Sequence, residues 1–249
     1  MTVPSRRPLT FLTLSIGGGS LVLFAYFLIF GAPVVFDVAR SNAARLAWDA
    51  LLCLAFFLQH SGMIRRGARQ CIARRVPAAH VPALYSIASG VTLFALVLLW
   101  QPTTQHLFHL HGPARWLSAC LAVLAIVGFA WGAQALRGFD PFGILPLQAS
   151  VGGGAPPSAA FVAAGPYRYV RHPLYLCMLL LIWSTPRLTT DQLLFNLLWS
   201  AWIVVGTKLE ERDLLADFGP TYRQYQLSVP MLIPSPRLFG RRGPPTSAG

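Results

Sequence analysis

The chain has 249 residues, of which 55% are hydrophobic and only 11% are charged. An ordinary soluble domain carries about 25% charged residues, so this composition excludes a typical soluble enzyme and favours a protein with several membrane spans. The formal net charge of +12 would suggest a nucleic-acid partner in a soluble protein. Here the basic residues gather in alternate loops between apolar runs, so we expect contact with lipid and none with nucleic acid.

Six apolar segments follow one another and predict an all-α polytopic integral membrane protein with about six transmembrane helices. They cover residues 11–30, 44–63, 84–100, 116–136, 174–186 and 192–207. The fifth is short, because a crossing takes about 17 residues or more. Only a few residues join it to the sixth, so we expect a C-terminal helical hairpin. Thr189, Thr190 and Asp191 are typical of a helix start.

The chain is predicted to be one membrane domain, residues 1–249, with its core at about 11–235. Residues 152–157, Gly-Gly-Gly-Ala-Pro-Pro, are typical of a flexible linker. Residues 236–249 are expected to form a disordered tail. Four tryptophans near the predicted span edges indicate an interfacial belt: Trp48, Trp100, Trp116 and Trp183.

The basic residues predict the orientation. Sixteen of the 20 lysines and arginines lie at the N-terminus, between the second and third segments, between the fourth and fifth, and after the sixth. The other four are Arg40, Arg45, Arg115 and Arg187. By the positive-inside rule we expect both termini to face the cytoplasm.

Two polar clusters lie on the predicted cytoplasmic side. The first, residues 165–175, reads Gly-Pro-Tyr-Arg-Tyr-Val-Arg-His-Pro-Leu-Tyr, and the second contains Glu210 and Glu211. Charged groups at span ends are unfavourable unless they pair, line a cavity or reach the interface. Reaching the interface is the alternative for each residue taken alone. Pro173 suits a first helical position, so Arg171 and His172 would stand at a helix N-terminus, which favours an anion.

These side chains predict a ligand that carries several kinds of group. Arg171 can hold a carboxylate by two hydrogen bonds. Glu210 and Glu211 can accept from an amine or from hydroxyls, and Tyr167, Tyr169 and Tyr175 can stack on a flat ring. S-adenosylmethionine is such a ligand, and other nucleotides fit the same residues.

The clusters resemble the C-terminal half of the isoprenylcysteine carboxyl methyltransferase superfamily, and most closely the branch of nurim and the bacterial methanethiol S-methyltransferases. The resemblance covers about residues 45–235. Its motifs are Leu-Ala-Trp-Asp at 46–49, Gln-His-Ser at 59–61, Arg-His-Pro-Leu-Tyr at 171–175, Trp-Ser-Thr-Pro at 183–186, Leu-Glu-Glu-Arg-Asp-Leu at 209–214 and Val-Pro-Met-Leu-Ile-Pro at 229–234. It implies an integral membrane methyltransferase that uses S-adenosylmethionine without a Rossmann domain.

The resemblance also implies roles for individual residues. Arg171, His172, Pro173 and Tyr175 would contact the cofactor, and Glu210 and Glu211 would close the pocket from the next helix. Tyr222 and Tyr225 would lie on the segment that covers it. Gln59 and His60 would approach the substrate.

Three further predictions concern the chemistry. His60 is the candidate to take or orient a thiol proton, because neutral histidine accepts protons at cytoplasmic pH; a hydrogen-bonded core histidine is the alternative. Asp140 either caps a helix or touches the substrate. The histidines at 106, 109 and 111 have no cysteine or carboxylate beside them, so we expect no metal site.

The leading hypothesis is therefore a membrane methyltransferase that acts on a small thiol, converting methanethiol to dimethyl sulfide. The alternatives are transfer to a lipid, an isoprenoid or a prenylcysteine carboxylate, or a non-catalytic membrane protein like nurim. The expected partners are a small-molecule methyl acceptor and the bilayer, and the sequence does not predict an oligomeric state.

Overall fold

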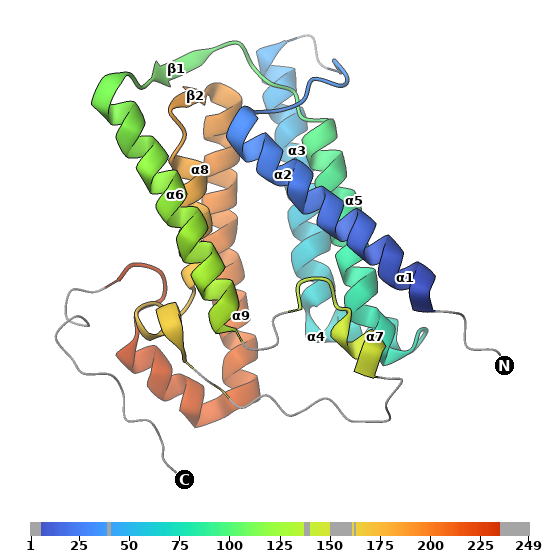
Figure 1. Ribbon diagram of the computed structural model, residues 1–249. Helices are drawn as coiled ribbons and strands as arrows, with labels where there is room; N and C mark the ends of the chain where they lie inside the picture. The colour runs from blue at the N-terminus through green and yellow to red at the C-terminus, as the bar shows by residue number, and fades with distance from the viewer. Residues whose placement is uncertain (1–5, 39–40, 137–139, 150–160, 162, 235–249) are drawn as a thin grey trace. The chain divides into compact units, whose positions relative to one another are not determined.

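The computed structural model describes the chain except residues 1–5, 39–40, 137–139, 150–160, 162 and 235–249 (Figure 1). The predicted linker at 152–157 and tail at 236–249 lie outside the described residues. The helices are α1 Arg6–Thr13, the π-helical η1 Leu14–Gly18, α2 Gly19–Phe30, α3 Asn42–Ile64, α4 Arg66–Ala73, η2 Ala78–His80, α5 Val81–Leu98, α6 Gly112–Ala135, α7 Leu145–Ala149, η3 Gly165–Arg168, α8 Pro173–Trp183 and α9 Thr190–Ser228. Two short strands, β1 His106–His109 and β2 Arg187–Thr189, pair antiparallel.

The prediction of an all-α polytopic membrane protein is confirmed. Five of the described helical stretches are long and apolar enough to cross a membrane: Arg7–Phe30, Asn42–Ile64, Ala78–Leu98, Gly112–Ala135 and Thr190–Ser228. The fifth predicted segment corresponds to α8, which has only 11 residues. At about 1.5 Å per residue it is about half as long as the hydrocarbon core is thick. A sixth crossing and the C-terminal hairpin therefore stay predictions.

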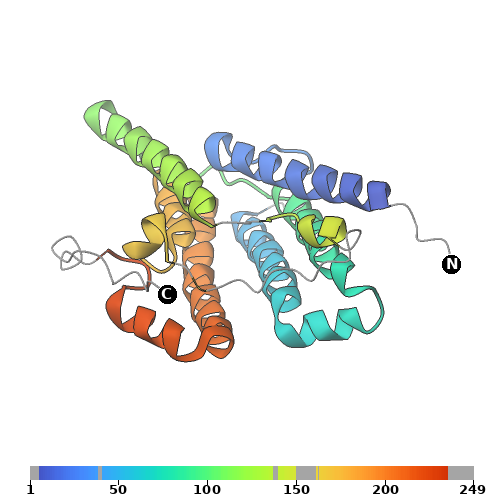
Figure 2. The same cartoon turned by 60° about the horizontal axis from the view of Figure 1, so that its bottom comes forward.

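The described residues pack as two compact units, and the first consists of Met1–His109, Asp140–Ser158 and Arg187–Trp202. Within it, α2 and α3 each pack against α5, as both views show (Figures 1 and 2). Its core is aromatic: Phe24 stacks on Trp199 at a centroid distance of 4.9 Å, and Phe57 on Trp202 at 4.8 Å. These large rings fill the space between the helices of this unit.

Buried carboxylates organise one end of the first unit. Asp191, in the first turn of α9, accepts hydrogen bonds from the Trp100 indole (3.1 Å) and from the backbone N–H and hydroxyl of Thr103 (3.1 and 2.7 Å). Asp49 accepts from the backbone N–H of Gln101 at 2.9 Å. The helix start predicted at residues 189–191 is thus confirmed, because α9 begins at Thr190.

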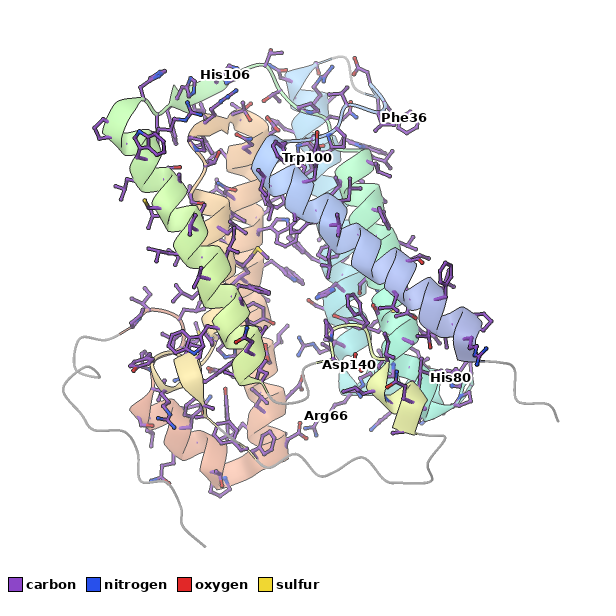
Figure 3. All side chains as sticks on the ribbon, viewed as in Figure 1. Phe36, Arg66, His80, Trp100, His106 and Asp140 are labelled. Carbon is purple, nitrogen blue, oxygen red and sulfur yellow. The ribbon has the colours of Figure 1, made fainter. Side chains whose placement is uncertain are left out.

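Trp100 corrects one sequence prediction. It is 1% exposed, so its assignment to an interfacial belt is wrong. Its indole N–H is satisfied inside the protein by a carboxylate, which permits full burial. In Figure 3, Trp100 and Phe36 lie at one end of the first unit, and His80 and Asp140 lie at the other.

The second unit consists of the described residues within Leu110–Phe139, Ala159–Pro186 and Ile203–Gly249. Here α6 and α8 lie side by side (Figures 1 and 2). Two glycines of α6 permit this approach: a Cβ at Gly128 would come within 2.8 Å of the Cys177 sulfur, and one at Gly132 within 2.8 Å of the Leu174 side chain. Small residues let membrane helices pack closely, and this contact fixes the start of α8.

The last helix is longer than the sixth apolar segment. α9 continues beyond residue 207 to residue 218 and then turns at Gly219, whose φ of 53° and ψ of −127° suit only glycine. Glu210 and Glu211 therefore lie within the helix rather than after it. The sequence Lys-Leu-Glu-Glu-Arg-Asp-Leu-Leu-Ala consists mostly of strong helix formers, so the helix persists where the apolar run stops. The prediction of one domain over 1–249 stays a prediction.

Candidate active site

Arg171 and Glu211 form a buried ion pair in the second unit. The Arg171 Nε donates to Glu211 Oε1 at 2.6 Å, and the two side chains are only 10% and 12% exposed. Arg171 Nη1 donates to the carbonyl oxygens of Gln226, at 2.9 Å, and of Val229. Charge-assisted hydrogen bonds of this kind are stronger than neutral ones. Arg171 therefore joins the residues before α8, the middle of α9 and the segment after its kink.

His172 lies beside this pair and is also buried, with 5% of its side chain exposed. Its Nε2 lies 3.2 Å from Glu211 Oε1, and its Nδ1 lies 3.8 Å from Glu210 Oε2. Burial lowers the pKa of the imidazole, and the carboxylates of Glu210 and Glu211 oppose this shift in part. The neutral ring thus donates from Nε2 to Glu211, which leaves the Nδ1 lone pair facing Glu210.

The two neighbouring glutamates differ in their surroundings. Glu211 accepts from Arg171, from His172 and, at 3.1 Å, from the side-chain amide of Gln226. Glu210 is 43% exposed and lies 3.8 Å from the His172 ring nitrogen. Glu211 is therefore held by three protein donors, whereas Glu210 keeps a carboxylate that a ligand can reach.

The segment after the kink is bound to the start of α8 by backbone hydrogen bonds. The N–H groups of Arg171 and His172 donate to the carbonyls of Pro230 and Met231 at 2.9 and 3.1 Å. This pairing places the predicted Val-Pro-Met-Leu-Ile-Pro motif directly against the Arg-His motif.

Tyr222 and Tyr225, predicted for the segment that covers the site, lie in the helix after the kink. Both are buried and pack with Val229 and Phe161. The Tyr225 hydroxyl donates to the backbone carbonyl of Tyr167, whose phenol pKa is raised by burial. Among the residues that the structure describes, the buried Tyr222 hydroxyl has no hydrogen-bond partner. The Arg171 guanidinium beside it can only donate, so the Tyr222 O–H stays available as a donor in the interior of the second unit.

The predicted helix start at Pro173 is confirmed, because α8 begins there. Tyr175, in the first turn, stacks on the His172 ring at a centroid distance of 5.6 Å. The predicted cofactor residues Tyr167, Arg171, His172, Pro173, Tyr175, Glu210, Glu211, Tyr222 and Tyr225 all belong to the second unit.

Gln59 and His60, predicted for the substrate side, belong to the first unit and form a polar network between α3 and α5. The His60 Nδ1 lies 3.2 Å from the Ser89 hydroxyl, and the Tyr85 hydroxyl lies 3.0 Å from Nε2. Gln59 accepts from the Thr92 hydroxyl at 2.8 Å. The His60 ring also stacks on Phe56. These contacts agree with the alternative that His60 is a hydrogen-bonded core histidine. A catalytic role for His60 stays a prediction.

Asp140 acts as a helix cap in the structure. Its Oδ2 accepts from the backbone N–H of Leu145, the first residue of α7, at 2.7 Å. A contact with the substrate stays a prediction. Within the described ranges, no group of three or more histidine, cysteine, aspartate or glutamate residues is placed to hold a metal ion.

Sequence reasoning missed several residues of these networks. No motif marks Gln226, and the carbonyl oxygens of Val229, Pro230 and Met231 have no side-chain signature. Tyr85 and Ser89 are four residues apart and so share one face of α5. That spacing, together with a histidine on a neighbouring apolar segment, could have predicted this network from the sequence.

The fold and the charged centre define an all-α polytopic membrane protein with a buried arginine–histidine–glutamate site. The profile of the family described as NnrU protein matches residues 50–216. The chain belongs to this family.

Its relatives include named enzymes. It is 35% identical over 214 residues to the methanethiol S-methyltransferase of Pseudomonas deceptionensis, covering 83% of this chain and 80% of the relative. It is 37% identical over 195 residues to methanethiol S-methyltransferase 2 of Bradyrhizobium diazoefficiens, covering 78% and 74%. Nurim from Rattus norvegicus is 28% identical over 203 residues, covering 76% and 75%. The resemblance to the nurim and methanethiol methyltransferase branch is thus confirmed. No solved structure matches the chain.

Proposed function

We propose that this protein is an S-adenosylmethionine-dependent methyltransferase that methylates a small thiol, with methanethiol as acceptor and dimethyl sulfide as product. The observation that carries the proposal is the 35–37% identity, over about four-fifths of the chain, to proteins named methanethiol S-methyltransferase. The all-α membrane fold and the buried site of the second unit support it.

The residues of the second unit fit the proposed cofactor. Glu210 offers a partly exposed carboxylate for an amine or a ribose hydroxyl, and the Tyr222 hydroxyl, buried without a partner among the described residues, can take a further hydrogen bond. Tyr167, Arg171, His172, Pro173, Tyr175, Glu211 and Tyr225 complete the proposed set.

When bound, S-adenosylmethionine supplies a methyl group that forms a bond to the acceptor sulfur as its bond to the sulfonium breaks, which leaves a thioether and S-adenosylhomocysteine. The protein's task is mainly to position two reactants and to exclude water. In this proposal His60 takes the proton of the acceptor thiol, because the thiolate is the better nucleophile. Gln59 and Asp140 are proposed to contact the acceptor.

We place the protein in the inner membrane of a bacterium, with both termini and the proposed active site in the cytoplasm. The charge asymmetry of the loops and the bacterial origin of the named relatives support this orientation.

The direct test measures methyl transfer by detergent-purified protein. Protein, deuterium-labelled S-adenosylmethionine and methanethiol are incubated together, and labelled dimethyl sulfide is measured in the headspace by gas chromatography. The expected result is turnover that is lost in Glu210→Gln, with Leu227→Ala, at a side chain that is 85% exposed, as the matched control. If the label instead appears in a lipid or a prenylcysteine ester, and no labelled dimethyl sulfide forms, the proposed acceptor is wrong and that compound takes its place. A well-folded protein that neither binds the cofactor nor transfers its methyl group would refute the proposal that the protein is a methyltransferase.

A further inference from the structure

Gln226 occupies a special position in the buried charged centre. Its side-chain Nε2 donates to Glu211 Oε2 at 3.1 Å, and its backbone carbonyl accepts from Arg171 Nη1 at 2.9 Å. One residue therefore contacts both members of the ion pair. The Glu211 Oε1 is held by Arg171 and His172. Gln226 is the donor that holds Oε2, and so it limits rotation of the carboxylate.

We propose that Gln226 is a positioning residue, which holds Glu211 against Arg171 and His172 so that the His172 Nδ1 and the Glu210 carboxylate are presented together to the ammonium group of the ligand. The proposal rests on the proposed function, because it assigns one part of the proposed cofactor to one part of the site. It also separates the two glutamates: Glu211 orders the site, and Glu210 meets the ligand.

The geometry of the second unit gives the reason for this assignment. With Nε2 of His172 committed to Glu211, the Nδ1 is an acceptor. It lies 3.8 Å from Glu210 Oε2, which is too far for a direct hydrogen bond. Two acceptors at this separation, one of them charged and partly exposed, are complementary to a cationic donor with several N–H groups. An alkylammonium group has three such donors and no acceptor.

The amino-acid part of the ligand provides a specific test. We would titrate full-length protein in detergent with S-adenosylmethionine and with 5′-methylthioadenosine, which keeps the nucleoside but lacks the ammonium group. Gln226→Leu is expected to weaken S-adenosylmethionine about tenfold or more, the lower end for a hydrogen bond to a charged group. Binding of 5′-methylthioadenosine should change less than about twofold, and Leu227→Ala should change neither affinity.

A second variant separates positioning from folding. Gln226→Glu places a carboxyl beside Glu211, Arg171 and His172. Two carboxyls that share one site raise the pKa of one of them, so the new carboxyl holds a proton at low pH and then donates to Glu211 as the amide does. S-adenosylmethionine affinity of this variant should rise more steeply than that of wild type or Gln226→Leu as the pH falls from 8 to 6, since protonation of the ligand's own α-amino group affects all three alike. Thermal unfolding of each variant without ligand checks its fold.

The outcomes separate a positioning role of Gln226 from a purely structural one. Selective loss of S-adenosylmethionine affinity in Gln226→Leu, with pH-dependent rescue in Gln226→Glu, supports the proposal. Equal weakening of both ligands, or wild-type affinities in both variants, overturns it. Wild-type protein that is folded but binds neither ligand removes the proposed function instead. In that case the positioning of Glu211 is tested by whether the melting temperature of unliganded Gln226→Glu, relative to that of wild type at the same pH, is higher at pH 6 than at pH 8.

Discussion

The two adjacent glutamates should separate stability from ligand binding. Glu211 is 12% exposed and is paired with an arginine that is 10% exposed. Removing one partner of a buried pair costs about 3–5 kcal/mol. Glu211→Gln keeps the shape and one acceptor oxygen, but its amide faces the donor of Gln226. We therefore expect a loss near the lower limit, about 3 kcal/mol in the free energy of unfolding.

Glu210→Gln should behave differently. Its carboxylate is 43% exposed and lies 3.8 Å from a buried imidazole. An exposed pair contributes about 0–1 kcal/mol, so the unliganded protein should keep most of its stability. The ligand would lose a charged acceptor, so S-adenosylmethionine should bind at least about tenfold more weakly.

Thermal unfolding in detergent, followed by tryptophan fluorescence, measures both effects. For a chain of this size about 1 kcal/mol corresponds to about 2–4 °C, so Glu211→Gln should melt about 6–12 °C below wild type without ligand. Glu210→Gln should melt within about 4 °C of wild type. Added S-adenosylmethionine should raise the melting temperature of Glu210→Gln about 3 °C or more less than that of wild type, because tenfold weaker binding removes about 1.4 kcal/mol of stabilisation by the ligand. A Glu210→Gln variant that is less stable than Glu211→Gln, or that keeps the full ligand-induced rise, would contradict the separate roles of the two glutamates.

Four further predictions concern orientation, pH, the first unit and the kink. Cys71 is exposed on the basic helix α4, so a membrane-impermeant maleimide should label it in inverted vesicles and not in right-side-out cells, with Cys71→Ser as the control; the opposite pattern would reverse the orientation. Burial lowers the pKa of His172 below its usual value near 6.5. Below about pH 6.5 the unfolded state therefore binds more protons than the folded state, and the free energy of unfolding should fall as the pH drops. The melting temperature measured from pH 8 to 5 should change less for His172→Gln than for wild type. Asp191→Ala leaves its buried donors without an acceptor, at about 1–3 kcal/mol for each group, so the melting temperature should drop; an unchanged value would show that water replaces the carboxylate. Gly219→Ala forces a residue with a Cβ to φ 53°, at about 1–3 kcal/mol, and weaker S-adenosylmethionine binding is expected, whereas unchanged binding would mean that the chain relaxes without moving the site.

Sequence reasoning located the spans and the charged residues because both leave strong local signals. Long apolar runs predict crossing helices, and a proline after Arg-His predicts a helix start; α8 indeed begins at Pro173. The spacing of the two motifs also selected Arg171 and Glu211, which the structure brings to 2.6 Å. The prediction needed only the residue types, because arginine and glutamate are unfavourable near a membrane unless they are paired.

The sequence did not predict contacts that are made by backbone groups, because every residue has them. Arg171 is held partly by backbone carbonyls, and a carbonyl acceptor has no residue-type signature. The burial of Trp100 depends on Asp191, 91 positions away, and tryptophan suits both a core and an interface. The end of the sixth apolar run was likewise a poor guide to the end of α9, because polar helix formers extend a helix beyond its apolar part.

The turn at Gly219 explains how such distant residues meet. Glu211 and Gln226 are 15 positions apart, and in a continuous helix they would be separated by about 22 Å along the axis. Their side chains instead meet at 3.1 Å, because the chain reverses at a glycine that adopts φ 53°. The same reversal brings the carbonyls of Pro230 and Met231 back to the backbone of Arg171 and His172. The charged centre therefore depends on one backbone conformation that only glycine adopts readily, and the Phe-Gly-Pro sequence at 218–220 is as much a part of the candidate site as the arginine and the glutamates.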